Sequence, residues 1–221
     1  MRHPIDLEAL GTLFDHRVAP LAALLHIGLT PPLIEQRCRP GGPWQRLLPG
    51  ILLLSRAGPS RTQLVHAALM YAGEGAMLTA FDALCLHGMK SAIPLLGPIH
   101  VLAPRRSRAM GYAALRVEHT DRLPKPTIRR GFHTAPLERA AIDAIRRTKS
   151  IPDTKAILEE VSHFVGVQAL RTELALAPPR GTALARKLLG ESPARQLERA
   201  VLDRRRIPQP LPPTRVPATV G

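Results

Sequence analysis

The fold of the N-terminal part of the chain is decided by residues 28–55, which read GLTPPLIEQRCRPGGPWQRLLPGILLLS. Gly28 ends a preceding helix, Thr30 is a favourable N-cap, and Pro31 takes the first helical position, where its missing N–H costs nothing. The Pro-Gly-Gly-Pro run at 40–43 ends this helix. WQRLL and ILLLS then flank a Pro-Gly turn, a pattern that predicts two short antiparallel strands.

Two more helices are predicted upstream, over residues 5–14 (IDLEALGTLF) and over residues 18–27 (VAPLAALLHI), where Pro20 suits the first turn. Two helices joined by a short turn that contains glycine form a helix-turn-helix. A strand pair directly after such a unit makes a winged helix. Residues 1–57 are therefore predicted to be a winged helix-turn-helix domain.

From Ser60 onward helical and extended patterns alternate, so the sequence predicts an α+β middle domain (58–150) and a helical extension (151–190). Residues 191–221 are predicted to be a further helix and a mobile tail rich in proline. The predicted helices cover residues 61–71, 80–86, 136–147, 153–165, 167–176 and 182–189, and the predicted extended segments are 76–78, 98–103, 113–119 and 128–133. Thr79 is expected to cap the helix that begins at residue 80.

The composition limits the classes of partner. The 221 residues include 31 Lys and Arg against 17 Asp and Glu, for a net charge of +14, but only four Phe, two Tyr and one Trp. So few aromatic residues argue against a module that stacks single-stranded bases. Duplex DNA, structured RNA backbone or an acidic protein remain as partners for the positive charge.

The positive charge is unevenly distributed along the chain. Residues 1–60 carry a net charge of only +2, whereas residues 104–131 and 166–221 carry +6 each. Such basic blocks are also typical of solvated loops, and the abundance of arginine is equally typical of a GC-rich genome. Both explanations stay open beside nucleic-acid binding.

Several kinds of protein are excluded by what the sequence lacks. Cys38 and Cys85 lie far apart, with no CxxC motif, so a disulfide framework or a zinc site is not expected, and we expect a cytoplasmic protein. No apolar stretch has the character of a signal peptide or a membrane span. Without nucleotide-binding, nucleophile or metal-ligand motifs, we expect neither a cofactor nor an enzyme, and Cys85 with His87 is a poor dyad because they occupy different helix faces.

Over about residues 1–190 the chain resembles the actinobacterial AbiEi-type antitoxin family. The matching features, in chain order, are Gly28-Leu29-Thr30, Arg37, Arg39, WQRLLPG at 44–50, YAG at 71–73, the 76–78 segment with its helix, LHG at 86–88, the strand at 100–103 with the basic residues after it, and APLERAAIDA at 135–144. The chain departs from the family pattern at Ile51-Leu52-Leu53, where an aromatic residue is usual, and at Pro31-Pro32-Leu33, which leave few polar side chains at the start of the helix.

The resemblance implies a transcriptional autoregulator of a toxin–antitoxin system, whose winged helix binds operator DNA and whose remainder restrains a toxin. It also implies that residues 191–221 are the start of a Vsr-like endonuclease domain. No acidic pair follows Asp203 to hold a metal, so this part is expected to be a catalytically empty remnant. A protein-interaction module and a dead nuclease remnant are therefore the competing functions.

The candidate DNA contacts follow from the helix at 31–38. Ile34 and Cys38 should face the core, which turns Leu33, Gln36 and Arg37 outward with Glu35 at the margin. Gln36 could then pair with adenine and Arg37 with guanine or phosphate. Because the domain carries little net charge, a dimer or help from the central basic block is expected. Phosphate contacts that position the domain are expected from Arg39, Gln45, Arg46 and Arg56. The remaining candidates for DNA binding are Thr30 and, from the central basic block, Arg105, Arg106 and Arg108.

Overall fold

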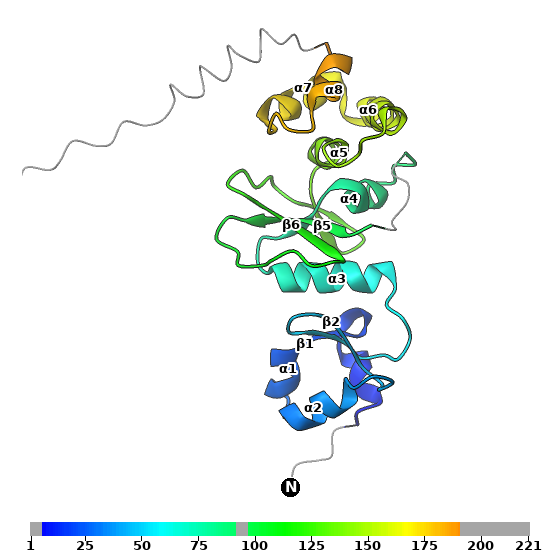
Figure 1. The fold of residues 1–221 in the computed structure, drawn as a ribbon, viewed down its shortest axis with the longest axis vertical. Helices are drawn as coiled ribbons and strands as arrows, with labels where there is room; N and C mark the ends of the chain where they lie inside the picture. The colour runs from blue at the N-terminus through cyan, green and yellow to red at the C-terminus, as the bar shows by residue number, and fades with distance from the viewer. Residues whose placement is uncertain (1–5, 92–96, 191–221) are drawn as a thin grey trace, which may run out of the picture.

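The computed structural model describes residues 6–91 and 97–190 and has an α+β fold with two separate sheets. The two sheets lie on opposite sides of one helix, and further helices cover the far side of the second sheet (Figure 1). The predicted helix and proline-rich tail at 191–221, with their nuclease-like interpretation, lie outside the described residues.

The N-terminal lobe, residues 6–57, contains a three-stranded antiparallel sheet in the order β1-β3-β2. Its core is formed by apolar side chains from every part of the lobe, among them Leu24, Ile34, Trp44 and Leu52. Its elements in chain order are η1 (Ala9–Leu13), η2 (Asp15–Arg17), β1 (Val18–Pro20), α1 (Leu21–His26), α2 (Pro31–Arg37), β2 (Gln45–Leu48) and β3 (Ile51–Leu53).

Two of the helix predictions in this lobe are corrected. The helix expected over 5–14 is instead the single 3-10 turn η1, which precedes a second such turn. The helix expected over 18–27 begins only at Leu21, because Val18 to Pro20 pair with β3. Proline is tolerated there because β1 is an edge strand, where a missing N–H breaks no ladder.

Helix α3 (Arg61–Ala72) lies between the two sheets (Figure 1). Its N-terminus has a capping box, in which the side chains of Ser60 and Gln63 each bond to the other residue's backbone N–H. Ala67 packs against the N-terminal sheet, whereas Val65 and Ala68 belong to the core of the second sheet. Because α3 is apolar on two faces, it joins the lobe to the rest of the molecule.

The second sheet has five strands in the order β6-β5-β4-β8-β7. Strands β5 and β6 are parallel, so residues 105–114 return along the sheet to begin β6. The single extended segment expected at 128–133 is two antiparallel strands, because Arg130 and Gly131, both with positive φ, turn the chain. The strands are β4 (Met77–Leu78), β5 (Ile99–Pro104), β6 (Leu115–Thr120), β7 (Thr127–Arg129) and β8 (Phe132–Thr134).

Five helices complete the described chain, with α4 and α5 packed together on the far side of the second sheet from α3 and α6 to α8 beyond them (Figure 1). No described helix combines the length and apolar character needed to cross a bilayer. Their bounds are α4 (Ala80–Leu86), α5 (Leu137–Ile145), α6 (Ile151–Val165), α7 (Val167–Leu176) and α8 (Ala183–Leu188).

A buried network of charged side chains holds α5 on the sheet. Asp143, only 1% exposed, accepts hydrogen bonds from Arg139 Nε at 2.8 Å and Arg146 Nη1 at 3.2 Å. It also accepts the hydroxyl of Thr79 at 2.7 Å. Thr79 occupies the N-cap position of α4 as predicted, but its side chain makes this contact instead of capping the helix. Glu118 of β6 extends the network through Arg146 at 2.8 Å.

Candidate nucleic-acid interface

Helix α2 presents a small polar face to solvent. Thr30 and Gln36 are exposed, and Ile34 is buried in the lobe as predicted. Thr30 is the N-cap residue, but its hydroxyl makes no capping hydrogen bond within the described chain. Leu33, expected to point outward, is half-buried and packs against the core. Gln36 is therefore the exposed side chain of α2 that has the amide fork needed to read adenine.

Arg37 does not point outward as the helical pattern predicted. Its guanidinium lies over the ring of Trp44, 5.6 Å from the centroid, and 3.6 Å from a carboxylate oxygen of Glu8. The side chain is only 22% exposed. The reason is that the 38–44 turn folds Trp44 back against the end of α2, which the spacing of apolar residues within the helix could not reveal. Arg37 stabilises the lobe in this structure and is not presented for a base contact.

Arg46 lies on β2 and forms an ion pair with Glu35 of α2, through Nη2 and Oε2. Both side chains are exposed, Arg46 by 48% and Glu35 by 69%. Glu35 is therefore part of the exposed surface rather than marginal. An exposed pair of this kind contributes little stability, so its arginine can exchange the carboxylate for another anion.

Gln45 has a different role from the phosphate contact expected of it. Its side-chain amide donates to the backbone oxygens of Ser55, at 2.9 Å, and of Ala57, at 2.7 Å. These bonds tie the chain after β3 to the start of β2. Gln45 thus fixes the segment that carries Arg56 and leads into α3.

Arg39 and Arg56 remain as exposed cations of the N-terminal lobe. Arg39 follows α2 and Arg56 follows β3, and neither has an ion pair with any residue that the structure describes. Arg39 lies next to α2, which the Arg46–Glu35 ion pair links to β2. Arg56 lies in the segment that Gln45 ties to β2. With Gln36 and Arg46 they form what we call the α2 surface, a set of four side chains that could contact nucleic acid.

The central basic loop, residues 105–112, follows strand β5 and is held by contacts with the last turn of α3. Ser107 Oγ donates to the carbonyl of Ala72 at 3.0 Å, and the N–H of Met110 donates to the Tyr71 hydroxyl at 3.1 Å. These contacts place the loop at the C-terminal end of α3. Arg106 and Arg108 are exposed, whereas Arg105 lies 3.4 Å from Asp121 in an exposed ion pair.

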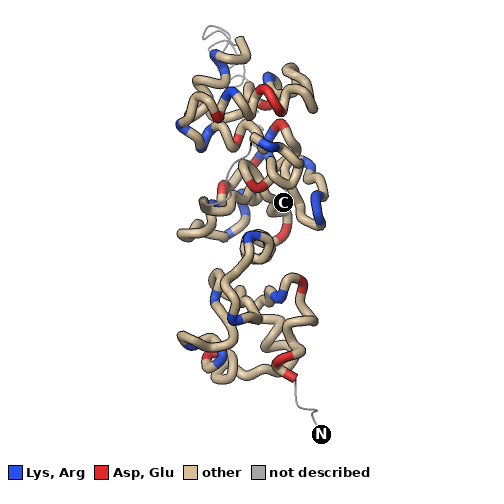
Figure 2. The backbone as a smooth tube through the Cα atoms, turned by 90° about the vertical axis from the view of Figure 1, so that its right-hand side faces the viewer, with Lys and Arg blue, Asp and Glu red and all other residues tan. Residues whose placement is uncertain are grey.

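Positive charge is not concentrated in one stripe. Figure 2 shows basic and acidic segments interleaved along the molecule. Several arginines of the basic block are used internally: Arg122 forms an ion pair with Glu173, and Arg129 Nε donates to His87 Nδ1 at 3.2 Å. The number of basic residues in this block therefore overstates the number of cations that are free to contact a partner.

Three histidines have a pKa that lies below its ordinary value. Burial lowers the pKa of His66, and the neighbouring His16 lowers it further. Burial also lowers the pKa of His87, whose Nε2 lies 2.9 Å from the Ala135 carbonyl. The pKa of His100 falls to about 4 because it is buried near Arg147, Arg61 and Arg116. A lowered pKa disfavours the charged ring, which suits the arginines that lie near His87 and His100. Within the described ranges, no three His, Cys, Asp or Glu side chains are grouped to hold a metal ion.

Comparison with known proteins finds a likeness at the level of the fold. No family model matches the chain, and no curated protein matches it. Its fold is similar to that in the crystal structure of the RV2827C protein from Mycobacterium tuberculosis, with a TM-score of 0.55 over 90% of this chain and 83% of that one. The two sequences are 16% identical. At that identity the likeness concerns the fold alone.

Proposed function

We propose that the chain is a noncatalytic DNA-binding regulator whose N-terminal lobe is a winged helix. The observation that carries the proposal is the order β1-α1-α2-β2-β3 with its strands arranged β1-β3-β2. In this arrangement two helices pack on a small antiparallel sheet, and the second helix is the element that enters the major groove in helix-turn-helix proteins. Here that element is α2, at the end of the molecule opposite the helical extension (Figure 1).

The side chains of the α2 surface divide into two roles. Gln36 can donate and accept along the edge of an adenine, which is a sequence-reading contact. Arg39 and Arg56 are exposed cations that suit phosphates, which position the lobe without reading sequence. Arg46 joins them once a phosphate replaces Glu35. The surface is small, so its affinity depends on a second set of contacts or on a second copy of the chain.

The resemblance to AbiEi-type antitoxins gives this proposal its biological setting. An autoregulator of that type represses its own operon from an operator and neutralises a partner toxin with the rest of the chain. For this chain the operator contact is assigned to the N-terminal lobe, and the toxin contact to the α+β middle and the helices beyond it.

A second candidate function is supported by exposed apolar side chains at the helical end. Phe164 is 67% exposed at the end of α6, Leu176 is 55% exposed at the end of α7, and Leu188 is 40% exposed on α8. If these side chains form one contiguous apolar patch, that patch is the kind of surface that marks protein–protein contacts. Co-purification of a protein encoded next to this one, lost on Phe164→Ser, would support a protein-interaction module.

A mobility-shift competition tests the DNA-binding proposal. The chain should shift the duplex from upstream of its own coding sequence at about 0.1 M salt, and an unrelated duplex should compete poorly. Arg39→Ala should weaken both complexes, whereas Gln36→Ala should weaken mainly the specific one. Lys155→Ala, an exposed cation on α6, is the matched control. Equal competition by the unrelated duplex would remove the operator role.

A further inference from the structure

Strained backbone is concentrated at one junction of the molecule. In the described chain, four residues other than glycine have positive φ: His16 (55°), Arg17 (60°), Ala80 (53°) and Arg130 (49°). Three of them lie where η2 meets the β7–β8 hairpin beside α3. Such conformations cost free energy, and proteins keep them mostly at functional positions.

Aromatic rings hold the two sides of this junction together. His16 of η2 stacks on Phe132 of β8, with centroids 5.8 Å apart and planes 26° apart. His66 of α3 meets both rings edge-on, at 5.2 Å from His16 and 6.1 Å from Phe132. The carbonyl of His16 also accepts a hydrogen bond from Gln63 Nε2 at 2.9 Å. The lobe and the hairpin are therefore fixed relative to each other.

Three exposed arginines belong to the segments that meet at this junction. Arg17 follows His16, and its carbonyl accepts the N–H of Leu54 at 2.8 Å, which places Arg56 close along the chain. Arg130 lies two residues before Phe132, at the turn of the hairpin. All three side chains belong to exposed residues, and none has an ion pair with a described residue. We call Arg17, Arg56 and Arg130 the junction arginines.

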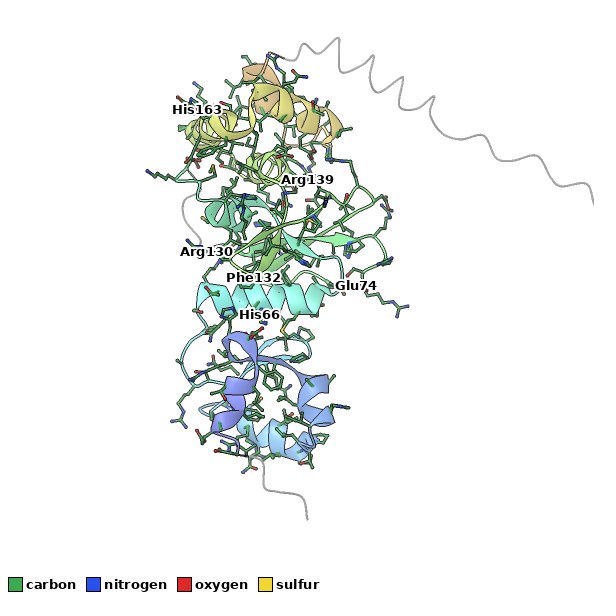
Figure 3. The ribbon with its side chains drawn as sticks, turned by 180° about the vertical axis from the view of Figure 1, so that it is seen from behind. His66, Glu74, Arg130, Phe132, Arg139 and His163 are labelled. Atoms are coloured by element: carbon green, nitrogen blue, oxygen red, sulfur yellow. The ribbon has the colours of Figure 1, made fainter. Side chains whose placement is uncertain are left out.

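The junction arginines and the central basic loop lie at opposite ends of α3. Figure 3 shows Arg130 beside one end of the helix and Glu74, which follows its last turn, at the other. The helix has 12 residues and is therefore about 18 Å long. Of these two groups, the junction arginines share Arg56 with the α2 surface, so the sugar–phosphate backbone of one DNA strand could pass from the α2 surface to the junction.

We propose that the junction arginines are a second phosphate-binding surface, on which the backbone of duplex DNA crosses from the N-terminal lobe to the β7–β8 hairpin. The inference rests on the proposed DNA-binding function and adds two contacts to the α2 surface: Arg17 at another edge of the lobe, and Arg130 on the β7–β8 hairpin outside the lobe. The strained backbone of Arg17 and Arg130 would then have a function, which is to direct two arginine side chains from separate elements toward the same DNA strand. A contact with both lobe and hairpin also sets the angle at which α2 meets the groove.

The test uses asparagine substitutions, because asparagine tolerates positive φ and removes the charge. The full chain and its Arg17→Asn, Arg130→Asn and Arg39→Ala variants are titrated, by fluorescence anisotropy at several salt concentrations, with the upstream duplex of about three helical turns. Each junction variant should lower the slope of log affinity against log salt by about 1, as the loss of one phosphate contact does. Arg130→Lys should restore the slope. Arg180→Asn, an exposed arginine between α7 and α8, is the control.

The outcomes separate this inference from the function on which it rests. If the unaltered chain shows no preference for the upstream duplex over an unrelated duplex, the proposed function fails and the junction site fails with it. If Arg39→Ala weakens binding but Arg17→Asn and Arg130→Asn keep the slope of the unaltered chain, the junction site is overturned and the DNA-binding function stands. A loss of slope in Arg180→Asn equal to that in Arg130→Asn also overturns the site, because the effect is then one of general charge. Circular dichroism melts confirm that each variant is folded.

Discussion

The guanidinium of Arg37 lies over the indole ring of Trp44, 5.6 Å from the ring centroid, and joins the end of helix α2 to the start of the following strand. Arg37 is thereby withdrawn from the surface that it was expected to supply, since its side chain is only 22% exposed. Arginine is a residue type that suits DNA contacts, but Arg37 stabilises the lobe instead. The α2 surface depends instead on Gln36, Arg39, Arg46 and Arg56.

Replacement of Arg37 should therefore change stability before it changes sequence recognition. Arg37→Ala removes the cation over Trp44 and the packing of the arginine stem, and should lower the free energy of unfolding by about 1–2 kcal/mol. Gln36→Ala, one residue away and exposed, should leave stability within about 0.5 kcal/mol. Urea denaturation measures both. An Arg37→Ala chain as stable as the unaltered one, but defective in DNA binding, would mean that Arg37 reads DNA after all.

Neutralising Glu35 should strengthen DNA binding. Its carboxylate holds Arg46 in an ion pair and also repels phosphates, so Glu35→Gln frees one cation and removes one anion. We expect affinity to rise several-fold at low salt and the gain to shrink as salt is added. In the double variant with Arg46→Ala most of the gain should disappear. A gain that survives in the double variant would show that Arg46 is not the residue released.

Acidification should destabilise the chain through His100. Its pKa is about 4 in the folded chain because of burial near three arginines, against 6.5 as its ordinary value, and its Nδ1 has no hydrogen-bond partner in the described residues. The unfolded chain therefore takes up a proton below about pH 6.5 that the folded chain refuses until about pH 4. Stability present above pH 6.5 is lost across that window, by on the order of 2–3 kcal/mol.

The measurement is the free energy of unfolding at pH 7 and pH 5, for the unaltered chain and for His100→Asn, which cannot be protonated. The variant should lose less stability over that interval than the unaltered chain. Because burial also lowers the pKa of His66 and His87, some dependence should remain. Equal losses in the two chains would rule out His100 as a cause.

Removal of the charge at Asp143 should be the most damaging of these changes. Asp143→Asn keeps the shape of the side chain but leaves Arg139 and Arg146 without part of their buried counter-charge. Breaking a buried ion pair in this way costs about 3–5 kcal/mol, so a marginally stable chain would unfold near room temperature. Glu159→Gln, exposed on α6, is the control and should melt with the unaltered chain. A small shift for Asp143→Asn would show that the network relaxes easily.

Local signals in the sequence were enough to predict most of the elements. Thr30 and Pro31 predicted the start of α2, and the Pro49-Gly50 turn predicted the β2–β3 pair. Strand β1 was missed because it is stabilised by pairing with β3, which is distant in sequence, whereas its own residues fit a helix. The sequence predicts one extended segment at 128–133 where the structure has the β7–β8 hairpin. The turn of the hairpin lies at Arg130, whose positive φ is uncommon for arginine, so no turn is expected there.

The candidate site was less predictable than the fold. Helical spacing placed Ile34 inside and Gln36 outside, as the structure has them. It could not show that Gln45 bonds the backbone after β3, because that contact depends on how the chain folds back. The sequence could not relate Arg17 to Arg130, because only the packing of His16 on Phe132 brings their two segments together.

Recognition of duplex DNA by α2 can be measured as a specificity ratio. The ratio is the affinity of the full chain for its own upstream duplex divided by that for a shuffled duplex of equal length and composition, measured at about 0.15 M salt. We expect a ratio on the order of 10³ or more, lowered about tenfold by Gln36→Ala. A ratio near unity, or one that Gln36→Ala leaves unchanged, would show that α2 does not read DNA.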